Sequence, residues 1–519
     1  MGELKDVFRS KKHAFFAVLI VGVIAHGFMM LNKISYHDDI HVLFNMGATV
    51  VLGRWGLELL AWICRVTGLG WYSTPLFVGS LSLVFIGMSA VLVCEILHID
   101  SKRGMILSGG IMAAFPVVAS TFAYMFTAAP YFFAYFLVIL SVYLLSRQFS
   151  VKSCAAAVFL ISFSTGIYQA SLAVCASLVV LLLIDHVLEY SERAFADHMK
   201  EALLYAGTLF GSLVLYLIEN QIALKLTDTE LSDYQGMNGK YDIAKLPGKL
   251  LGTYHDFLGG GYTGINSTHF LSNSVKAVIV LAVIGVLVGL YQSKCAGIVK
   301  LWTLLLVAVF PIAAYLVNFF STEESLRVHT LMVYSLVYVF IFPVCMMERV
   351  RLKAKQETKD ASALGIRGWN CALSIFLVMF ITVYVSLDNA AYLKMNFVQE
   401  QTTAYFNTLV TRIKSVDGYR DEYPVILLGF PYRADDQSFF HSDWFDGITF
   451  DGFDYDQRRL FNDYAWEDYV RYHVGYAPDY CEDYLDWWQL PEVEKMNCYP
   501  DDGSIKVVNE RVVVKFAEY

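Results

Sequence analysis

The chain has 519 residues, of which 56% are hydrophobic and only 17% are charged. This composition is too apolar for a soluble protein of this length and is typical of a polytopic membrane protein. The net charge is −9, but residues 389–519 alone contain 12 Lys and Arg against 24 Asp and Glu. An acidic C-terminal segment behind a weakly basic membrane body argues against nucleic acid as a partner.

Eleven segments approach the roughly 20 apolar residues that a membrane-spanning helix needs. They are residues 13–32, 75–97, 104–122, 130–146, 153–167, 170–188, 202–223, 274–292, 300–319, 330–347 and 369–387. The fifth and sixth are short enough to form one broken helix. The first is long and has no small-residue cleavage site, so we expect it to stay as a membrane anchor rather than to be removed as a signal peptide.

The basic residues predict the orientation of these spans, because Lys and Arg near span ends stay on the cytoplasmic side. Four basic residues precede the first span, and further ones lie in alternate connections, with the largest group in residues 349–367. The short connections that alternate with these basic ones are nearly free of Lys and Arg. The sequence therefore predicts a cytoplasmic N-terminus, a transmembrane domain over residues 1–388 and an extracytoplasmic domain over residues 389–519.

Three segments on the predicted outer side are long enough to build a site, namely residues 33–74, residues 225–273 and the C-terminal domain. The first contains the adjacent acids Asp38 and Asp39, directly after the first span. It continues with an aromatic and apolar stretch from Gly53 to Trp62 that suits a helix lying in the membrane interface. Such a helix would place Arg54 and Glu58 one turn apart.

The C-terminal domain has the pattern of a small α/β fold. A strand is predicted over residues 423–429 and a hairpin over residues 504–515, around Asn509-Glu510. Cys481 and Cys498 both fall in this domain and would form a disulfide if the compartment is oxidising and their geometry permits. Aromatic and acidic residues are dense between the strands and fit either a carbohydrate-binding surface or the core of the domain. They include Trp444, Asp446, Phe450, Asp451, Phe453, Asp454, Trp466, Trp487 and Trp488.

The outer acids and bases fit glycosyl transfer from a lipid phosphate. The chain has no Walker loop and no dinucleotide fingerprint after a predicted strand. Neither a nucleotide donor nor a cofactor nor a metal site is therefore predicted, and dependence on a divalent metal stays open. Asp38 or Asp39 could act as the general base on an acceptor hydroxyl. Arg54, Arg327 or Lys225 could stabilise the departing phosphate. The alternative for the acidic pair is that it caps a following helix and keeps the loop solvated.

One base, rather than two carboxyl groups flanking the bond, is what an inverting transfer requires. Further polar residues lie at the outer ends of the spans and are candidates for substrate contact. Each has a structural alternative, such as pairing of Arg327 with the preceding glutamates or a helix-end hydrogen bond of Tyr168 and Gln169. The candidates for substrate contact are His37, Glu58, Tyr168, Gln169 and His329.

Five motifs, in this order, resemble the Gtr type II glucosyltransferases, the family associated with serotype conversion of bacterial O-antigen. They are Tyr36-His37-Asp38-Asp39, Gly53-Arg54-Trp55-Gly56, Tyr72-Ser73-Thr74-Pro75, Gly166-Ile167-Tyr168-Gln169-Ala170 and Tyr499-Pro500-Asp501-Asp502-Gly503-Ser504-Ile505. Each motif alone is weak, but their order and placement on the outer side make the combination more specific. The resemblance runs from the first outer loop to the last strand.

The resemblance implies a GT-C type fold in the bacterial cytoplasmic membrane, a catalytic acid in the first outer loop, a polyprenyl-phosphate sugar donor and an outer C-terminal domain. Carried onto this sequence, the acids are Asp38 and Asp39 and the loop arginine is Arg54, whereas Tyr168 and Gln169 match without an assigned role. We expect transfer of a hexose, with glucose favoured, to a cell-surface polysaccharide or O-antigen-like glycan. The alternatives are a flippase or transporter of lipid-linked sugar, and a glycan polymerase or ligase with a lipid-diphosphate oligosaccharide donor.

Overall fold

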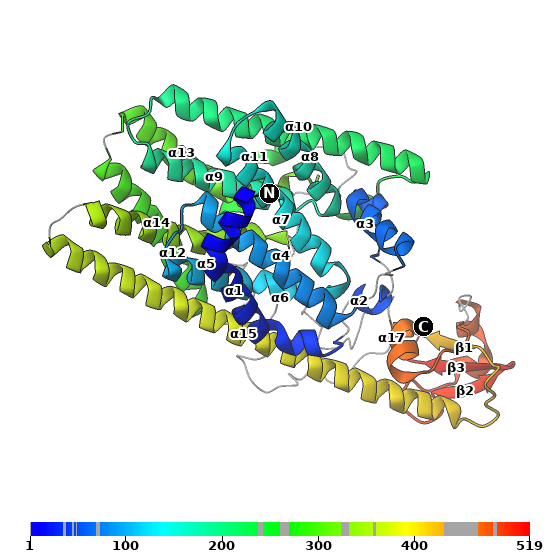
Figure 1. The fold of residues 1–519 in the computed structure, drawn as a ribbon. Helices are drawn as coiled ribbons and strands as arrows, with labels where there is room; N and C mark the ends of the chain where they lie inside the picture. The colour runs from blue at the N-terminus through cyan, green and yellow to red at the C-terminus, as the bar shows by residue number, and fades with distance from the viewer. Residues whose placement is uncertain are drawn as a thin grey trace.

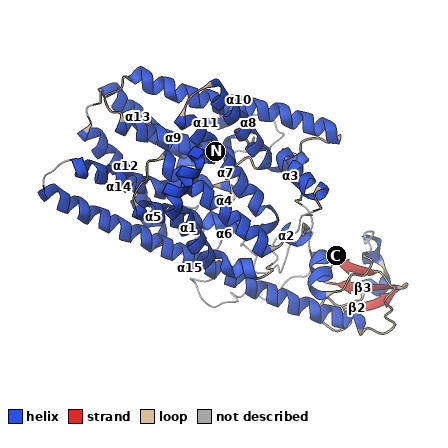
Figure 2. Ribbon diagram, in the orientation of Figure 1, coloured by secondary structure: helices blue, strands red, loops and turns tan. Residues whose placement is uncertain are grey.

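The computed structural model of the protein describes most of the chain. The described residues are 2–34, 38–43, 46–47, 49–68, 73–236, 242–259, 269–293, 295–322, 332–356, 360–429, 466–480 and 485–518. Most of them lie in a bundle of long helices, and a small sheet lies beside one end of that bundle (Figure 1; Figure 2). The predictions for His37, Arg327 and His329 lie outside the described residues.

Four long helices from the first third of the chain form the centre of the bundle. Helix α1 (Gly2–Leu31) packs on α4 (Pro75–Ile96) and α5 (Lys102–Ala114), and α4 packs on α7 (Met125–Arg147). Small residues permit close approach, since a Cβ on Gly109 of α5 would lie 2.3 Å from the backbone oxygen of Ala14 in α1. Helix α6 (Pro116–Phe122) continues α5 after a 40° bend. Phe115 is extended at this bend because the residue before a proline avoids the helical conformation.

The remaining helices surround this centre. They are α8 (Val151–Ile167), α9 (Ser171–Glu189), α10 (Phe195–Thr227), α11 (Leu246–Gly259), α12 (His269–Gln292), α13 (Gly297–Ala314), α14 (Tyr338–Gln356) and α15 (Asp360–Lys414). Helix α8 lies between α7 and α10, whereas α9 packs on α7 and α13. Helices α8 and α9 are separated at Tyr168–Ala170, where Tyr168 has extended backbone angles.

Seven helices in the described part of the chain are long and apolar enough to cross a membrane, or eight if α5 and α6 count as one bent span. The chain is thus a polytopic α-helical membrane protein, but the predicted count of eleven is not confirmed. Each of the eleven predicted ranges overlaps a helix. Some of these helices fall short as spans: α8 has only 17 residues, and the apolar part of α12 is limited to Val275–Tyr291.

Three short strands build the sheet near the C-terminus, and they confirm the predicted strand and hairpin. β1 (Val425–Leu428) pairs in parallel with β3 (Arg511–Lys515), which pairs antiparallel with β2 (Ile505–Val508). Asn509 and Glu510 connect β2 and β3 with φ angles of 49° and 59°. Two successive positive φ angles are typical of a tight hairpin turn whose twist matches that of its strands.

Helix α15 continues past the domain boundary predicted after Asp388, and its last turns pack against this sheet. Phe406, Leu409 and Ile413 of α15 share a hydrophobic core with Trp466 and Tyr469 of α17 (Trp466–Tyr469) and with the strands. We call residues 399–429, 466–480 and 485–518 the C-terminal module. Trp466 is therefore part of the core of this module, while Trp487 and Trp488 pack on a second apolar cluster.

The other aromatic and acidic residues proposed for carbohydrate contact, from Trp444 to Asp454, lie outside the described residues. The same holds for Cys481, whereas Cys498 carries a free thiol. The carbohydrate-binding surface therefore stays a prediction, and the structure shows no disulfide at Cys498.

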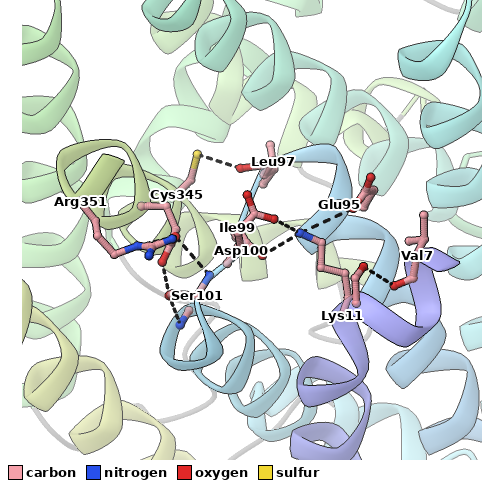
Figure 3. A network of polar contacts seen from close by, with 12 residues as sticks. Val7, Lys11, Glu95, Leu97, Ile99, Asp100, Ser101, Cys345 and Arg351 are labelled. Carbon is pink, nitrogen blue, oxygen red and sulfur yellow. Dashed lines mark hydrogen bonds and ion pairs between the residues drawn. The ribbon is translucent and has the colours of Figure 1, made fainter. Parts of the chain in front are cut away.

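Polar residues at the helix ends gather at two opposite ends of the bundle. At one end Arg147 pairs with Glu3, and Lys11 contacts Asp100 and lies 3.6 Å from Glu95. The backbone N–H of Ser101 donates to Glu348 there at 3.2 Å, and Arg351 pairs with the same glutamate (Figure 3). We call this the basic end, because basic residues that predict the cytoplasmic side of the spans lie here. Which side of the membrane it faces stays a prediction.

Candidate functional site

At the other end of the bundle, Asp39 is fully buried and joins three segments of the chain. It lies in the short helix α2 (Asp38–His41), and its carboxylate pairs with Lys33, accepts a hydrogen bond from the Ser73 hydroxyl and accepts the Phe126 N–H at 3.1 Å. Burial raises the pKa of the Asp39 carboxyl, while Lys33 and the two hydrogen bonds lower it. Asp39 thereby ties the first loop to the start of α4 and to the start of α7.

The neighbouring acid, Asp38, has a different environment. It is the first residue of α2 and is half-buried, whereas Asp39 has no exposed surface. The sequence treats the two acids as equivalent candidates, but the structure distinguishes them by their access to solvent. A group that takes a proton from a substrate must be within hydrogen-bond reach of it, and access therefore bears on which acid can do so.

Arg54 lies beside two stacked tyrosines. It precedes α3 (Trp55–Val66), and its Nη1 donates to the Tyr131 hydroxyl at 2.9 Å. Its guanidinium carbon lies 5.9 Å from the ring of Tyr131 and 5.7 Å from that of Tyr168, and these rings stack with centroids 3.7 Å apart. The Nε of Arg54 and the Tyr168 hydroxyl are buried without a hydrogen-bond partner among the described residues. A buried donor in this state is suited to an added acceptor.

A small cavity opens beside this arginine. Its walls come from four separate segments of the chain, the first loop, the α8–α9 break, the segment after α10 and the segment after α13. They include Arg54, Tyr168, Gln169, Tyr234 and Ser321. The structure therefore brings together three of the residues singled out in the sequence, namely Arg54, Tyr168 and Gln169.

Two side chains hold the turn that presents Arg54. Gln169 Nε2 donates to the carbonyl of Leu52 at 2.7 Å, and the Tyr216 hydroxyl donates to the carbonyl of Gly53 at 3.0 Å. Gly53 has a φ of 73°, in the region that glycine tolerates best. Gln169 thus makes a structural hydrogen bond and also lines the cavity. Tyr216 is absent from the predicted site residues because it lies in an apolar predicted span with no local motif around it.

Helix α7 connects the Asp39 and Arg54 environments. Its residue Phe126 provides the N–H that Asp39 accepts, and its residue Tyr131 accepts from Arg54. Five residues separate these two points, which corresponds to about 7.5 Å along a helix. Asp39 and Arg54 therefore both form hydrogen bonds with residues near the start of α7.

The other predicted site residues that the structure describes lie apart from the cavity walls. Glu58 follows Arg54 by one turn, as predicted, but accepts from Thr49 at 2.7 Å and pairs with Arg65 at 2.6 Å. Lys225 is exposed in the last turn of α10. In the described part of the chain, no group of three or more His, Cys, Asp and Glu could hold a metal ion.

The fold and this site define a multi-span membrane protein that carries buried acidic and basic groups at one end of its helix bundle. Comparison with protein families gives its class, because the family model described as glucosyl transferase GtrII matches residues 27–340. The chain therefore belongs to the GtrII glucosyl transferase family, which confirms the resemblance and supports a glycosyltransferase role. Comparison with curated proteins and with solved structures gave no significant match.

The matched range contains Asp38, Asp39, Arg54, Tyr168 and Gln169. It ends before α15 and the C-terminal module, so the last of the five motifs, Tyr499–Ile505, lies outside it. The family match thus supports the membrane part of the prediction and does not cover the C-terminal part.

Proposed function

We propose that the protein transfers a hexose, with glucose favoured, from a polyprenyl-phosphate donor to a cell-surface polysaccharide or O-antigen-like glycan. The family match carries the glucosyltransferase part of this proposal. The donor, the acceptor and the location at the outer face of a bacterial cytoplasmic membrane follow from the resemblance and from the distribution of basic residues. The long apolar helices would surround the polyprenyl chain of the donor.

In this mechanism Asp38 is the general base and Asp39 positions it. The carboxylate of Asp38 takes the proton of an acceptor hydroxyl, whose oxygen attacks the anomeric carbon of the sugar. The bond from that carbon to the phosphate oxygen breaks, and polyprenyl phosphate leaves with the bonding electrons. A single displacement inverts the anomeric centre. The preference for Asp38 rests on solvent access, because Asp38 is half-buried whereas Asp39 has no exposed surface.

Arg54 is the group best placed to stabilise the phosphate of the donor. Its unpartnered Nε, its fixed turn and the adjacent cavity support this role. The attraction between a fixed positive charge and a leaving phosphate grows as negative charge develops on the phosphate, and it is strongest in a site with little water. The stacked rings of Tyr131 and Tyr168 support the guanidinium from one side. Lys225, Arg327 and His329 remain secondary candidates for contact with the donor.

The decisive experiment measures transfer of labelled glucose from synthetic polyprenyl-phosphate glucose to cell-envelope glycan by the purified protein. Asp38→Asn should lower the rate by about 100-fold or more, the usual contribution of a general base. Asp39→Asn should lower it less and should also reduce thermal stability. Asp228→Asn is a matched control, because Asp228 is exposed and its left-handed backbone also suits asparagine.

Each outcome of this experiment has a definite meaning. Full activity of Asp38→Asn would remove Asp38 as the base, and loss confined to Asp39→Asn would reverse the two roles. Absence of transfer by the wild-type protein, with glycans from several bacterial envelopes as acceptors, would refute the proposed donor and acceptor. Movement of the labelled donor across liposomes without transfer would instead support a flippase.

A further inference from the structure

Helix α2, which carries the acidic pair, lies between the helix bundle and the C-terminal module. Its residue Asp39 is directed into the bundle, where it contacts Ser73 and the N–H of Phe126. The next residue, Ile40, is 2% exposed and belongs to the hydrophobic core of the C-terminal module. One residue further, His41 Nδ1 lies 2.7 Å from Asp468 Oδ2 in α17. Successive residues of α2 thus bind two different parts of the protein.

A second set of contacts holds the other side of the acidic pair. Gln399 of α15 donates from Nε2 to the carbonyl of Lys33 at 2.9 Å. The carbonyl of Gln399 in turn accepts the Tyr469 hydroxyl at 3.0 Å, next to Thr403. Lys33 is also the ion-pair partner of Asp39. The C-terminal module therefore contacts the chain both before and after Asp38 and Asp39.

From this arrangement we infer that the C-terminal module positions the acidic pair for the reaction, with Asp468 and His41 as positioning residues. The inference rests on the proposed function and extends it, because that proposal assigns the C-terminal module no role in the reaction. A helix of four residues makes too few internal hydrogen bonds to hold its own orientation. The direction of Asp38 is then determined by what α2 packs against, and the module provides the contacts of Ile40 and His41.

The test is a kinetic comparison of variants of the full-length protein in the glucose-transfer assay. Asp468→Ala and His41→Ala should each lower kcat by about tenfold, the size expected for one charge-assisted hydrogen bond. The KM for the donor should stay within about twofold, since Arg54 is untouched. The double variant should be no slower than the slower single variant, because both changes remove one interaction. Asp468→Asn keeps an acceptor for the imidazole and should recover part of the rate.

Two control variants separate positioning from general damage. Arg471→Ala removes the other partner of Asp468, at 3.5 Å, and should leave kcat unchanged. Glu189→Gln breaks a comparable pair at the basic end, where His98 Nε2 lies 3.9 Å from the Glu189 carboxylate, and should also leave kcat unchanged. Equal loss of rate in the controls and in Asp468→Ala would overturn the inference.

A readout that needs no catalysis keeps this inference distinct from the proposed function. Hydrogen exchange of the peptide covering residues 33–43 should become faster in Asp468→Ala and stay unchanged in Glu189→Gln. Unchanged exchange in Asp468→Ala would overturn the contact itself, and faster exchange with full kcat would overturn its role in positioning. If the wild-type protein transfers no sugar, the proposed function fails, and the exchange data alone decide whether the module holds α2.

Discussion

Replacing Gly53 by alanine should displace Arg54 and weaken donor binding. A Cβ on Gly53 would lie 2.6 Å from the Tyr216 hydroxyl and 3.0 Å from Gln169 Nε2, closer than carbon tolerates. The left-handed backbone costs a non-glycine residue about 1–2 kcal/mol. Losing one or both of the hydrogen bonds that hold the turn adds about 0.5–1.5 kcal/mol each. The expected destabilisation of this turn is therefore about 1.5–5 kcal/mol.

Thermal unfolding and the KM for the polyprenyl-phosphate donor measure these two effects. Gly68→Ala is the matched control, since Gly68 has nearly the same φ, 72°, but a Cβ there would meet no atom within 4 Å. The control should show the backbone cost alone, about 1–2 kcal/mol, with an unchanged KM. Adding Tyr216→Phe to Gly53→Ala should relieve the closest contact and recover part of the stability. Equal behaviour of Gly53→Ala and Gly68→Ala would refute the reasoning.

Three further substitutions test the support of the site. Arg54→Lys should raise the donor KM about tenfold, because the single ammonium nitrogen of lysine cannot reach both the Tyr131 hydroxyl and a phosphate on the Nε side of the guanidinium. An unchanged KM would exclude Arg54 from donor binding. Gly166→Ala would place a Cβ 2.5 Å from the indole of Trp55 and should lower stability by about 1–3 kcal/mol in thermal unfolding, by pushing α3 away from α8. Lys249→Met should lower stability by about 1–3 kcal/mol in the same measurement, because the buried ammonium donates to two backbone carbonyls near the cavity wall. Wild-type stability of this variant would show that water satisfies these carbonyls equally well.

Local patterns in the sequence were sufficient to predict the elements but not the partners of the site residues. The hairpin around Asn509 could be predicted because its turn and strands are contiguous. Two partners of Asp39, in contrast, are Ser73 and the N–H of Phe126, which lie 34 and 87 residues away in sequence. No periodicity relates such positions, and a backbone N–H has no signature in the residue type. The difference between Asp38 and Asp39 follows from these distant contacts.

The boundary of the C-terminal domain shows the same limit. The hydrophobic run of the last span ends near Leu387, and the sequence therefore predicts the end of the membrane domain there. The helix continues to Lys414 because Phe406, Leu409 and Ile413 recur at helical spacing and bury one face against the sheet. An amphipathic continuation with polar residues on its outer face is hard to separate from a loop when the surface it packs on is unknown.

Because α15 is one continuous helix, it fixes the rotation of the C-terminal module relative to the helix bundle. Its 55 residues correspond to about 82 Å of helix, well beyond the roughly 30 Å core of a bilayer. Each residue inserted between the last apolar turn and the sheet would rotate the C-terminal module by about 100° and raise it by about 1.5 Å. Seven inserted residues would bring it back nearly to its original direction, whereas two would turn Asp468 away from His41. The sequence length of this connection, and not only its composition, is therefore under constraint.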